Sequence, residues 1–280
     1  MQTKNFETIL ISDMRRLTKV VDELYGFDFS NYALSSLNRR VLRVLDLFKL
    51  GNMDNLISKI ESDAEFFHQF LMEITVNTTE MFRDPEMWTY LRDKILPGLS
   101  HRETIRVWHA ACSSGEEVYS MAILLEEEGL LDRSRLFASD IDRNVLGIAK
   151  KGLYKSTRLA QNHKNYEAFG GRKRLSSYFE QGEEDRGIQM DKSLMRNSFF
   201  TVHDLVKGQP FGKFDLVLVR NVLIYFNKQL QNEVMKLIHE NMTLGGYLVL
   251  GSKETIRWNE CAHKYLEISS EERIYKKIKE

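Results

Sequence analysis

The sequence predicts an α/β protein in which a small all-α domain precedes a mainly parallel β-sheet. Residues 1–95 show a helical spacing of apolar side chains, whereas strand and helix patterns alternate from Thr104 onward. Residues 176–198 interrupt the alternation with a hairpin pattern around an acidic turn. Since alternating strands and helices form a parallel sheet with helices on both faces, we predict a helical domain over 1–95, an α/β domain over 96–280 and a β-subdomain inserted at 176–198.

Three helices are predicted before the sheet. The first lies within residues 33–50, where one face carries Leu34, Leu37, Val41, Val44, Leu45 and Phe48, and Gly51 follows at the expected cap. The second covers Ala64–Ile74, with Phe66, Phe67, Phe70 and Leu71 inward. The third begins at Asp84-Pro85, runs to about Ile95 and is stopped by Pro97-Gly98.

The α/β region is predicted to contain six strands and three helices. The strands are Thr104–Ala110, Arg135–Ser139, Phe199–His203, Phe214–Val219, Tyr247–Gly251 and a closing strand around Arg273–Ile278. The helices fall at about 116–128, 142–151 and 228–241. Ligands of such sheets bind beyond the carboxyl ends of the strands, near a switch in strand order.

The composition is typical of a globular protein. Of 280 residues, 42% are hydrophobic and 29% charged, and 40 basic residues balance 40 acidic ones. The two cysteines, Cys112 and Cys261, have no metal-ligand spacing, and no metal is expected. No signal peptide or long apolar run is evident, so we expect a cytoplasmic protein.

Residues 106–120 are the most informative segment. A buried strand breaks at small residues and Gly115, which lets the backbone approach a ligand, and a helix then opens with Glu116 and Glu117. Two carboxylates at a helix start do not suit a phosphate. They suit a ligand with positive charge and hydroxyl groups, and the sulfonium, ammonium and ribose of S-adenosylmethionine fit that description.

Two further strands end in polar residues. Asp140 lies 25 residues after Gly115, the spacing at which nucleotide-binding folds place a ribose-binding carboxylate, while Asp142 is interpreted as a helix N-cap. The apolar strand at Phe214–Val219 ends in Arg220 and Asn221, with Tyr225 five residues beyond Arg220. The segment Thr75–Pro85 would, by itself, be a polar link between two helices.

Taken in this order, the four segments resemble those of CheR-type chemoreceptor glutamate methyltransferases. That family carries a threonine-rich segment ending in Phe-Arg-Asp, an Ala-Cys-Ser-Thr-Gly-Glu-Glu loop, an Asp-Ile-Asp strand end and an Arg-Asn-Val…Ile-Tyr-Phe segment. The similarity covers roughly residues 30–280, with Ser114 and Val118 as mild departures and Met81 at a position that is usually aromatic. Gly251-Ser252-Lys253-Glu254 stands where the family carries a Gly-His-Ser-Glu strand end. It implies a class I S-adenosylmethionine-dependent methyltransferase fold, with a Rossmann-like sheet and a β-subdomain at Tyr178-Phe179.

The resemblance also implies roles for individual residues. Glu117 would bind the ammonium of the methionine moiety, Asp140 the ribose, and Asp204-Leu205 the adenine; Arg83 and Tyr225 would act at the methyl-transfer site as catalytic residues. The complete cofactor-binding set is Asn77, Thr79, Arg83, Gly115, Glu117, Asp140, Asp204, Leu205, Arg220 and Asn221. Because a glutamate acceptor is already ionised at neutral pH, no general base is required, and we expect Arg83 to position the carboxylate.

The expected partner is the glutamate-rich cytoplasmic helical region of a chemoreceptor. Arg39, Arg40 and Arg43 are predicted on the polar side of their helix, and residues 150–174 hold eight basic residues against Glu167. Nucleic acid is not expected as a partner, since aromatic residues are sparse among the basic ones and the overall charge is balanced. Direct membrane insertion is not expected, since no apolar run is long enough.

Alternative functions remain open at the level of sequence. They are a non-catalytic S-adenosylmethionine-binding regulator, the same methyl transfer on a non-chemotaxis acidic protein, and a nicotinamide-dependent oxidoreductase. The last is disfavoured because the glycine pattern G-x-G-x-x-G is absent.

Overall fold

The computed structural model describes residues 9–75, 79–181 and 187–280. The chain forms two compact units, one of residues 1–77 with 224–231 and one of residues 78–223 with 232–280. Each unit has its own hydrophobic core, so each is described by itself.

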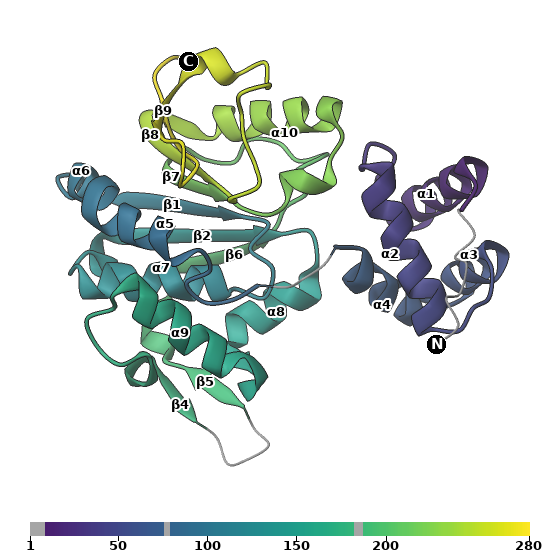
Figure 1. Cartoon of the computed structure of the whole chain (residues 1–280), viewed down its shortest axis with the longest axis horizontal. Coiled ribbons are helices and arrows are strands. Elements are labelled where there is room, and N and C mark those ends of the chain that lie inside the picture. Colours follow the sequence, from purple (N-terminus) through teal and green to yellow (C-terminus); the bar gives the residue numbers. More distant parts are fainter. Residues whose placement is uncertain (1–8, 76–78, 182–186) are drawn as a thin grey trace. The chain divides into compact units, whose positions relative to one another are not determined.

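The helical unit packs four helices around one core. They are α1 (Ile11–Tyr25), α2 (Leu34–Leu47), α3 (Met53–Ser62) and α4 (Ala64–Thr75) (Figure 1). The predicted inward residues of α4 are all buried, as are Leu37, Val41 and Val44 of α2. Leu34 is 54% exposed because it occupies the first turn of α2, which contributes little to the core.

A segment from far along the sequence completes this unit. Residues 224–231 join it through backbone hydrogen bonds from Ala33 N to Tyr225 O (2.8 Å) and from Asn227 N to Asn31 O (3.0 Å). The rings of Tyr32 and Phe226 meet edge to face with centroids 5.2 Å apart. This association was not predicted, because neither residues 31–33 nor residues 225–227 form a strand pattern long enough to indicate that they pair.

The second unit is built on a seven-stranded sheet in the order β6-β2-β1-β7-β8-β10-β9. The strands, in chain order, are β1 (Ile105–Ala110), β2 (Ser134–Asp140), β6 (Ser198–Val202), β7 (Phe214–Val219), β8 (Met242–Leu250), β9 (Tyr265–Ser269) and β10 (Ile274–Lys277). The five neighbouring strands β6, β2, β1, β7 and β8 are parallel to one another. The last two strands pair antiparallel, β10 with β8 and β9 with β10. All six predicted strands are present; β9, half exposed at the edge, was missed.

The helices α7 (Glu116–Glu127) and α8 (Arg143–Lys151) of this unit match the prediction, and α9 (Leu159–Phe169) was missed. The helix α10 (Lys228–Glu240) also matches the prediction; its first four residues belong to the helical unit and the rest to this one. The prediction that Pro97-Gly98 stops a helix at Ile95 was wrong. After α5 (Pro85–Tyr90), a π-helical turn over Leu91–Ile95 leads into α6 (Leu96–Leu99). Pro97 is tolerated because it lies in the first turn of α6, where no intrahelical amide donor is needed.

A three-stranded antiparallel sheet is inserted in this unit. It has the order β3-β5-β4, with β3 (Leu153–Tyr154), β4 (Phe179–Gln181) and β5 (Ile188–Met190). The predicted hairpin is therefore present, while its acidic turn at 182–186 lies outside the described residues. Ile188 and Met190 are buried in the core of the large sheet.

The division into units differs from the predicted boundary at residue 95. Residues 81–99 contribute Phe82, Trp88, Leu91 and Leu99 to the core under the large sheet. Helical periodicity identified these residues as helix but could not indicate which core they join. Within the described part of the chain, no helix is long and apolar enough to cross a membrane.

Candidate active site

The carboxyl ends of four adjacent strands, β6, β2, β1 and β7, form one edge of the large sheet. The strand order reverses between β1 and β7, the position at which open α/β sheets bind ligands. After β1 the chain turns through residues 111–115 into α7, and Cys112 N donates to Ser139 O of β2 (2.9 Å). Gly115 has φ 92°, and a Cβ there would lie 2.6 Å from the Cβ of Ala149. Only glycine fits this turn without displacing α8.

Left-handed backbone at residues other than glycine clusters around this edge. Ala111, Ser113 and Asn221 have φ values of 56°, 51° and 62°, and Phe82 and Asp84 have 51° and 57°. Each such residue costs on the order of 1–3 kcal/mol, and such conformations are concentrated at functional sites. The backbone geometry therefore supports the location that the sequence predicts.

Asp140, at the end of β2, is directed toward the loop after β1. Its two carboxylate oxygens accept the backbone N–H groups of Ser113 (2.8 Å) and Asp142 (3.0 Å). Burial raises the pKa of Asp140 to about 6, against the opposing effect of these hydrogen bonds. Asp142 caps α8 by accepting from Asn144 N (2.8 Å), as its N-cap interpretation requires.

Asp204 and Leu205 follow β6 at the same edge. His203 N donates to Asp140 O (3.0 Å), which places the two strand ends side by side. The Asp204 carboxylate accepts from Val206 N (2.7 Å) and closes a tight turn, and Leu205 is buried. The segment that the resemblance assigns to adenine thus adjoins the aspartate that it assigns to ribose.

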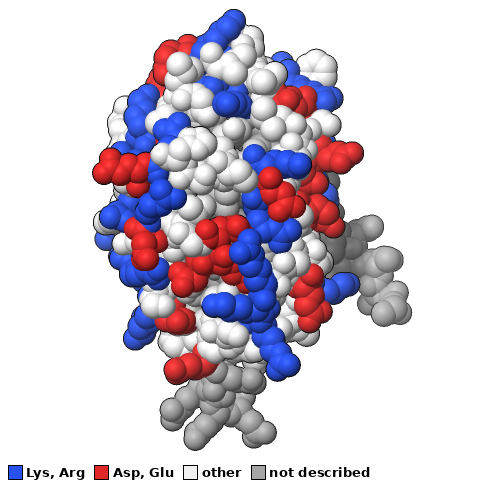
Figure 2. All heavy atoms as spheres, turned by 90° about the vertical axis from the view of Figure 1, so that its left-hand side faces the viewer, with Lys and Arg blue, Asp and Glu red and all other residues white. Residues whose placement is uncertain are grey.

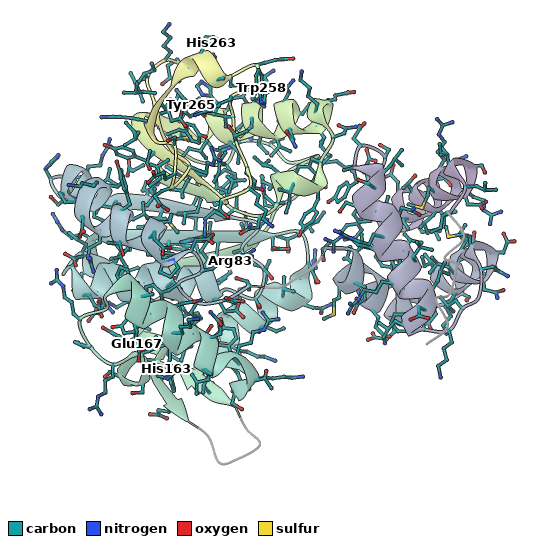
Figure 3. The ribbon with its side chains drawn as sticks, viewed as in Figure 1. Arg83, His163, Glu167, Trp258, His263 and Tyr265 are labelled. Carbon is teal, nitrogen blue, oxygen red and sulfur yellow. The ribbon has the colours of Figure 1, made fainter. Side chains whose placement is uncertain are left out.

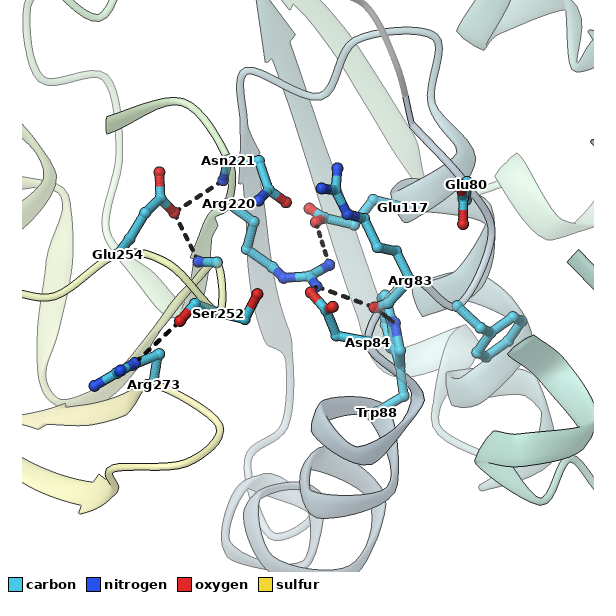
Figure 4. Close-up of polar contacts among 12 residues, drawn as sticks. Glu80, Arg83, Asp84, Trp88, Glu117, Arg220, Asn221, Ser252, Glu254 and Arg273 are labelled. Carbon is cyan, nitrogen blue, oxygen red and sulfur yellow. Dashed lines mark hydrogen bonds and ion pairs between the residues drawn. The ribbon is translucent and has the colours of Figure 1, made fainter. Parts of the chain in front are cut away.

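Glu117 and Arg220 form a partly buried ion pair between α7 and the end of β7, in which Arg220 is the buried partner. Arg220 NH1 lies 3.1 Å from Glu117 Oε2, and Arg220 NH2 lies 2.6 Å from Asp84 Oδ2 and 3.0 Å from the carbonyl oxygen of Arg83 (Figure 4). Burial alone would raise the pKa of Glu117, but hydrogen bonds and charge from His109 and Arg220 lower it. The carboxylate is therefore ionised at neutral pH.

Asn221 owes its left-handed conformation to a residue that the sequence analysis did not select. Glu254, after β8, is buried and accepts the backbone N–H groups of Asn221 (2.8 Å) and Gly251 (2.7 Å) on one oxygen (Figure 4). The only available signal was its place in Gly251-Ser252-Lys253-Glu254 after an apolar strand.

The loop that carries Arg83 is fixed by side chains of α7 and α9. Phe82 N donates to Ser120 Oγ of α7 (2.8 Å), while Met81 N donates to Asn162 Oδ1 of α9 (3.2 Å). Asn165 of α9 donates to Met81 O (3.0 Å). Sequence reasoning missed these residues because Asn and Ser within helices gave no sign that they bind a distant loop.

The remaining residues of this loop are placed by backbone contacts. Thr79 O accepts from Arg158 NH1 (2.6 Å), and Arg83 O accepts from Trp88 Nε1 (3.0 Å). In Figure 4 the Arg83 side chain points to the side of the site on which Glu117 and Asn221 lie. Figure 3 shows Arg83 away from the other side chains that it labels, which are His163 and Glu167 of α9 and, after β8, Trp258, His263 and Tyr265. Asn77 lies outside the described residues.

Tyr225 belongs to the helical unit, whereas the other described site residues belong to the sheet unit. Its ring is covered by Arg40 of α2, which is only 8% exposed. The prediction that Arg40 lies on a solvated helix face was therefore wrong. Arg39 is exposed, and Arg43 pairs with Glu73 (2.9 Å).

The basic residues of the stretch 150–174 lie on the surface of the sheet unit. Exposed side chains are Lys150, Lys151, Lys155, Arg158, Lys164, Arg172, Lys173 and Arg174. Two of them also hold the fold together, because Arg158 binds Thr79 O and Arg172 pairs with Glu128. On the face shown in Figure 2, basic and acidic side chains are interspersed and do not form a patch of one sign.

The donors and acceptors at the strand ends fit S-adenosylmethionine. Each oxygen of Glu117 accepts one hydrogen bond, from His109 and from Arg220, and an ionised carboxylate can accept about four. Arg220 Nε is buried with no partner within the described residues, as expected of a site that a polar ligand completes. No group of three metal-ligating side chains occurs in the described part of the chain.

A parallel sheet of this order, with a glycine turn after β1, an acid after β2 and an acidic helix start, defines a class I S-adenosylmethionine-dependent methyltransferase. The chain belongs to the CheR methyltransferase family. Residues 12–75 match the family model described as the CheR methyltransferase all-alpha domain, and residues 77–272 match the CheR methyltransferase SAM binding domain. S-adenosylmethionine is thus the cofactor.

Three relatives illustrate the similarity. A Pseudomonas putida protein that carries the name methyltransferase Cher3 is 38% identical over 95% of this chain and 96% of its own length. The chemotaxis protein methyltransferase of Listeria innocua is 30% identical, over 88% of this chain and 91% of its own length. That of Borreliella burgdorferi is 29% identical over 89% of both chains.

Proposed function

We propose that this protein transfers a methyl group from S-adenosylmethionine to glutamate side chains in the cytoplasmic helical region of a chemoreceptor, as a step of signalling adaptation. The observation that carries the proposal is the polar cluster around the buried Arg220 at the strand ends. In it Arg220 joins Glu117, on the predicted cofactor side, to Asp84 and the carbonyl of Arg83, on the predicted acceptor side. One guanidinium thereby aligns the two halves of the predicted site.

The chemistry requires alignment rather than proton removal. When bound, S-adenosylmethionine supplies a methyl group activated by its sulfonium. The acceptor carboxylate is ionised at neutral pH, and the Arg83 guanidinium can orient it by charge-assisted hydrogen bonds. Tyr225 can add a neutral hydrogen bond. Since a strong ion pair lowers the nucleophilicity of a carboxylate, Arg83 acts by positioning, and exclusion of water from both charges contributes further.

An acidic acceptor also agrees with the exposed basic residues. Arg39 of α2 and the stretch 150–174 present positive charge, and such charge accelerates encounter with an acidic helix. Arg40 is not part of this surface because it is buried.

The test is methyl transfer from S-adenosylmethionine labelled in the methyl group. The purified protein is incubated with the cytoplasmic fragments of chemoreceptors from its host, and alkali-labile label is measured as released methanol. Label in receptor fragments, lost when the candidate glutamates are changed to alanine, supports the proposal. Alkali-labile label only in other lysate proteins would assign the same chemistry to another acidic acceptor. Cofactor binding without any transfer would support the non-catalytic regulator.

A further inference from the structure

Glu117 is held by a residue of β1 that the sequence analysis did not select. His109 Nδ1 lies 2.8 Å from Glu117 Oε1, while Arg220 NH1 lies 3.1 Å from Oε2. Each carboxylate oxygen therefore has a different partner, one from β1 and one from the end of β7.

The location of His109 is otherwise apolar. Its side chain is 0% exposed, and its neighbours across β2 and β7 are Ala138 and Leu218. Its Nε2 atom is buried with no partner in the described part of the chain. Burial of a half-satisfied imidazole is unfavourable, so packing alone does not account for a histidine here. The contact with Glu117 is the one polar interaction that the structure shows for this ring.

The direction of the hydrogen bond follows from the charge of Glu117. An ionised carboxylate only accepts hydrogen bonds, so Nδ1 of His109 carries the proton and donates it. Nε2 is then the ring nitrogen without a partner in the described part of the chain. The orientation of the His109 ring is thus fixed by Glu117, and the orientation of Glu117 is fixed in turn.

This second donor prevents a different pairing. Arginine and carboxylate groups favour a bidentate arrangement with two parallel hydrogen bonds. Such a pair would turn both oxygens of Glu117 toward Arg220, and would thereby change the directions of the lone pairs that are left for a cationic ligand. His109 holds Oε1 away from Arg220, while Asp84 and the Arg83 carbonyl hold NH2 of Arg220.

We infer that His109 is a positioning residue for cofactor binding, which holds the Glu117 carboxylate in the orientation that accepts the ammonium group of S-adenosylmethionine. The inference rests on the proposed role of Glu117. If this is so, replacing His109 should lower the affinity for ligands that carry the amino-acid group and should not change the affinity for ligands that lack it.

The experiment compares two ligands by titration calorimetry. S-adenosylhomocysteine carries the ammonium group, whereas 5′-methylthioadenosine has the same nucleoside and thioether without the amino-acid group. His109→Leu should lower the affinity for S-adenosylhomocysteine about tenfold, the effect of losing a hydrogen bond to a charged group. The affinity for 5′-methylthioadenosine should not change. His109→Asn should restore part of the affinity, because its amide can donate from near the position of Nδ1. Binding of 5′-methylthioadenosine also reports that each variant is folded.

The inference would be overturned if His109→Leu bound S-adenosylhomocysteine with wild-type affinity. It would also be overturned if the variant lost affinity for both ligands by the same factor. Glu117→Gln separates this failure from that of the proposed role of Glu117. If Glu117→Gln has the wild-type ratio of affinities for the two ligands, Glu117 does not bind the ammonium. If Glu117→Gln loses the preference and His109→Leu keeps it, Glu117 acts without His109.

Discussion

The guanidinium of Arg40 lies over the ring of Tyr225, with Cζ 4.5 Å from the ring centroid. Arg40 belongs to α2, and Tyr225, 185 residues further along the chain, lies in the segment that joins the helical unit. Burial lowers the pKa of Arg40, and interaction with Tyr225 opposes that effect. Tyr225 is therefore held within the helical unit by Arg40.

Loss of the Arg40 side chain should impair methyl transfer through Tyr225. Arg40→Met removes the cation over the ring and should lower kcat about 2- to 30-fold, since such contacts contribute roughly 0.5–2 kcal/mol. Arg39→Met, at the exposed neighbouring position, is the matched control and should leave kcat unchanged. The losses of kcat caused by Arg40→Met and by Tyr225→Phe should not add in the double variant. Full additivity would show that Arg40 does not act through the Tyr225 hydroxyl.

Arg83→Ala should lower turnover by about 10- to 100-fold, because a charge-assisted hydrogen bond to the acceptor carboxylate is lost. Trp88 and Arg220 bind the main-chain carbonyl of residue 83, and alanine retains that carbonyl, so both contacts should persist in the variant. Arg83→Lys should recover only part of the rate, because a point charge does not reproduce the planar guanidinium. Tyr225→Phe should cost less than Arg83→Ala.

Single-turnover methyl transfer at saturating cofactor measures these effects. A wild-type rate for Arg83→Ala would mean that this arginine has no part in methyl transfer.

Affinity for S-adenosylhomocysteine should fall as the pH drops through 6. Burial raises the pKa of Asp140 to about 6, and ribose hydroxyls donate to the ionised carboxylate, so protonation competes with binding. Between pH 7.5 and 5.5 the affinity should fall about fourfold. The folding stability of the ligand-free protein should depend on pH in the opposite direction from the ligand affinity. A raised carboxyl pKa favours folding below the ordinary pKa, and this contribution is lost as the pH rises through 6.

Calorimetry of wild type and Asp140→Asn tests this dependence. The variant should bind more weakly at pH 7.5, and its affinity should be nearly independent of pH. Burial also raises the pKa of Glu116 to about 6. A fourfold dependence that persists in Asp140→Asn would therefore assign the titration to another group, with Glu116 as the first to examine.

Gly115→Ala should destabilise the sheet unit by about 1–3 kcal/mol, because the residue has φ 92° and the new methyl group would meet Ala149. Gly147→Ala, within α8, is the control. Its φ is ordinary and no atom lies within 4 Å of the added Cβ, so it should stabilise by about 0.5–1 kcal/mol. Denaturant unfolding measures both changes, and equal stability of the two variants would contradict the close approach of α7 and α8.

Local patterns of the sequence determined most of the sheet unit. The strands β2 and β7 end in polar residues, and β1 ends in a turn of small residues. Parallel strands bring such ends to one edge whatever the details of packing. The positions of Gly115, Glu117, Asp140 and Arg220 could therefore be predicted. The edge strand β9 and the helix α9 could not, because their apolar periodicity is weak.

Only the tertiary structure decided which side chains act on one another across long separations. Nothing local indicates that Glu254 binds the backbone of Asn221, that His109 binds Glu117, or that Arg40 covers Tyr225. These contacts depend on which faces two segments present once both are packed. Sequence spacing fixes the face of a residue within its own element, whereas burial and partner are set by the element packed against it.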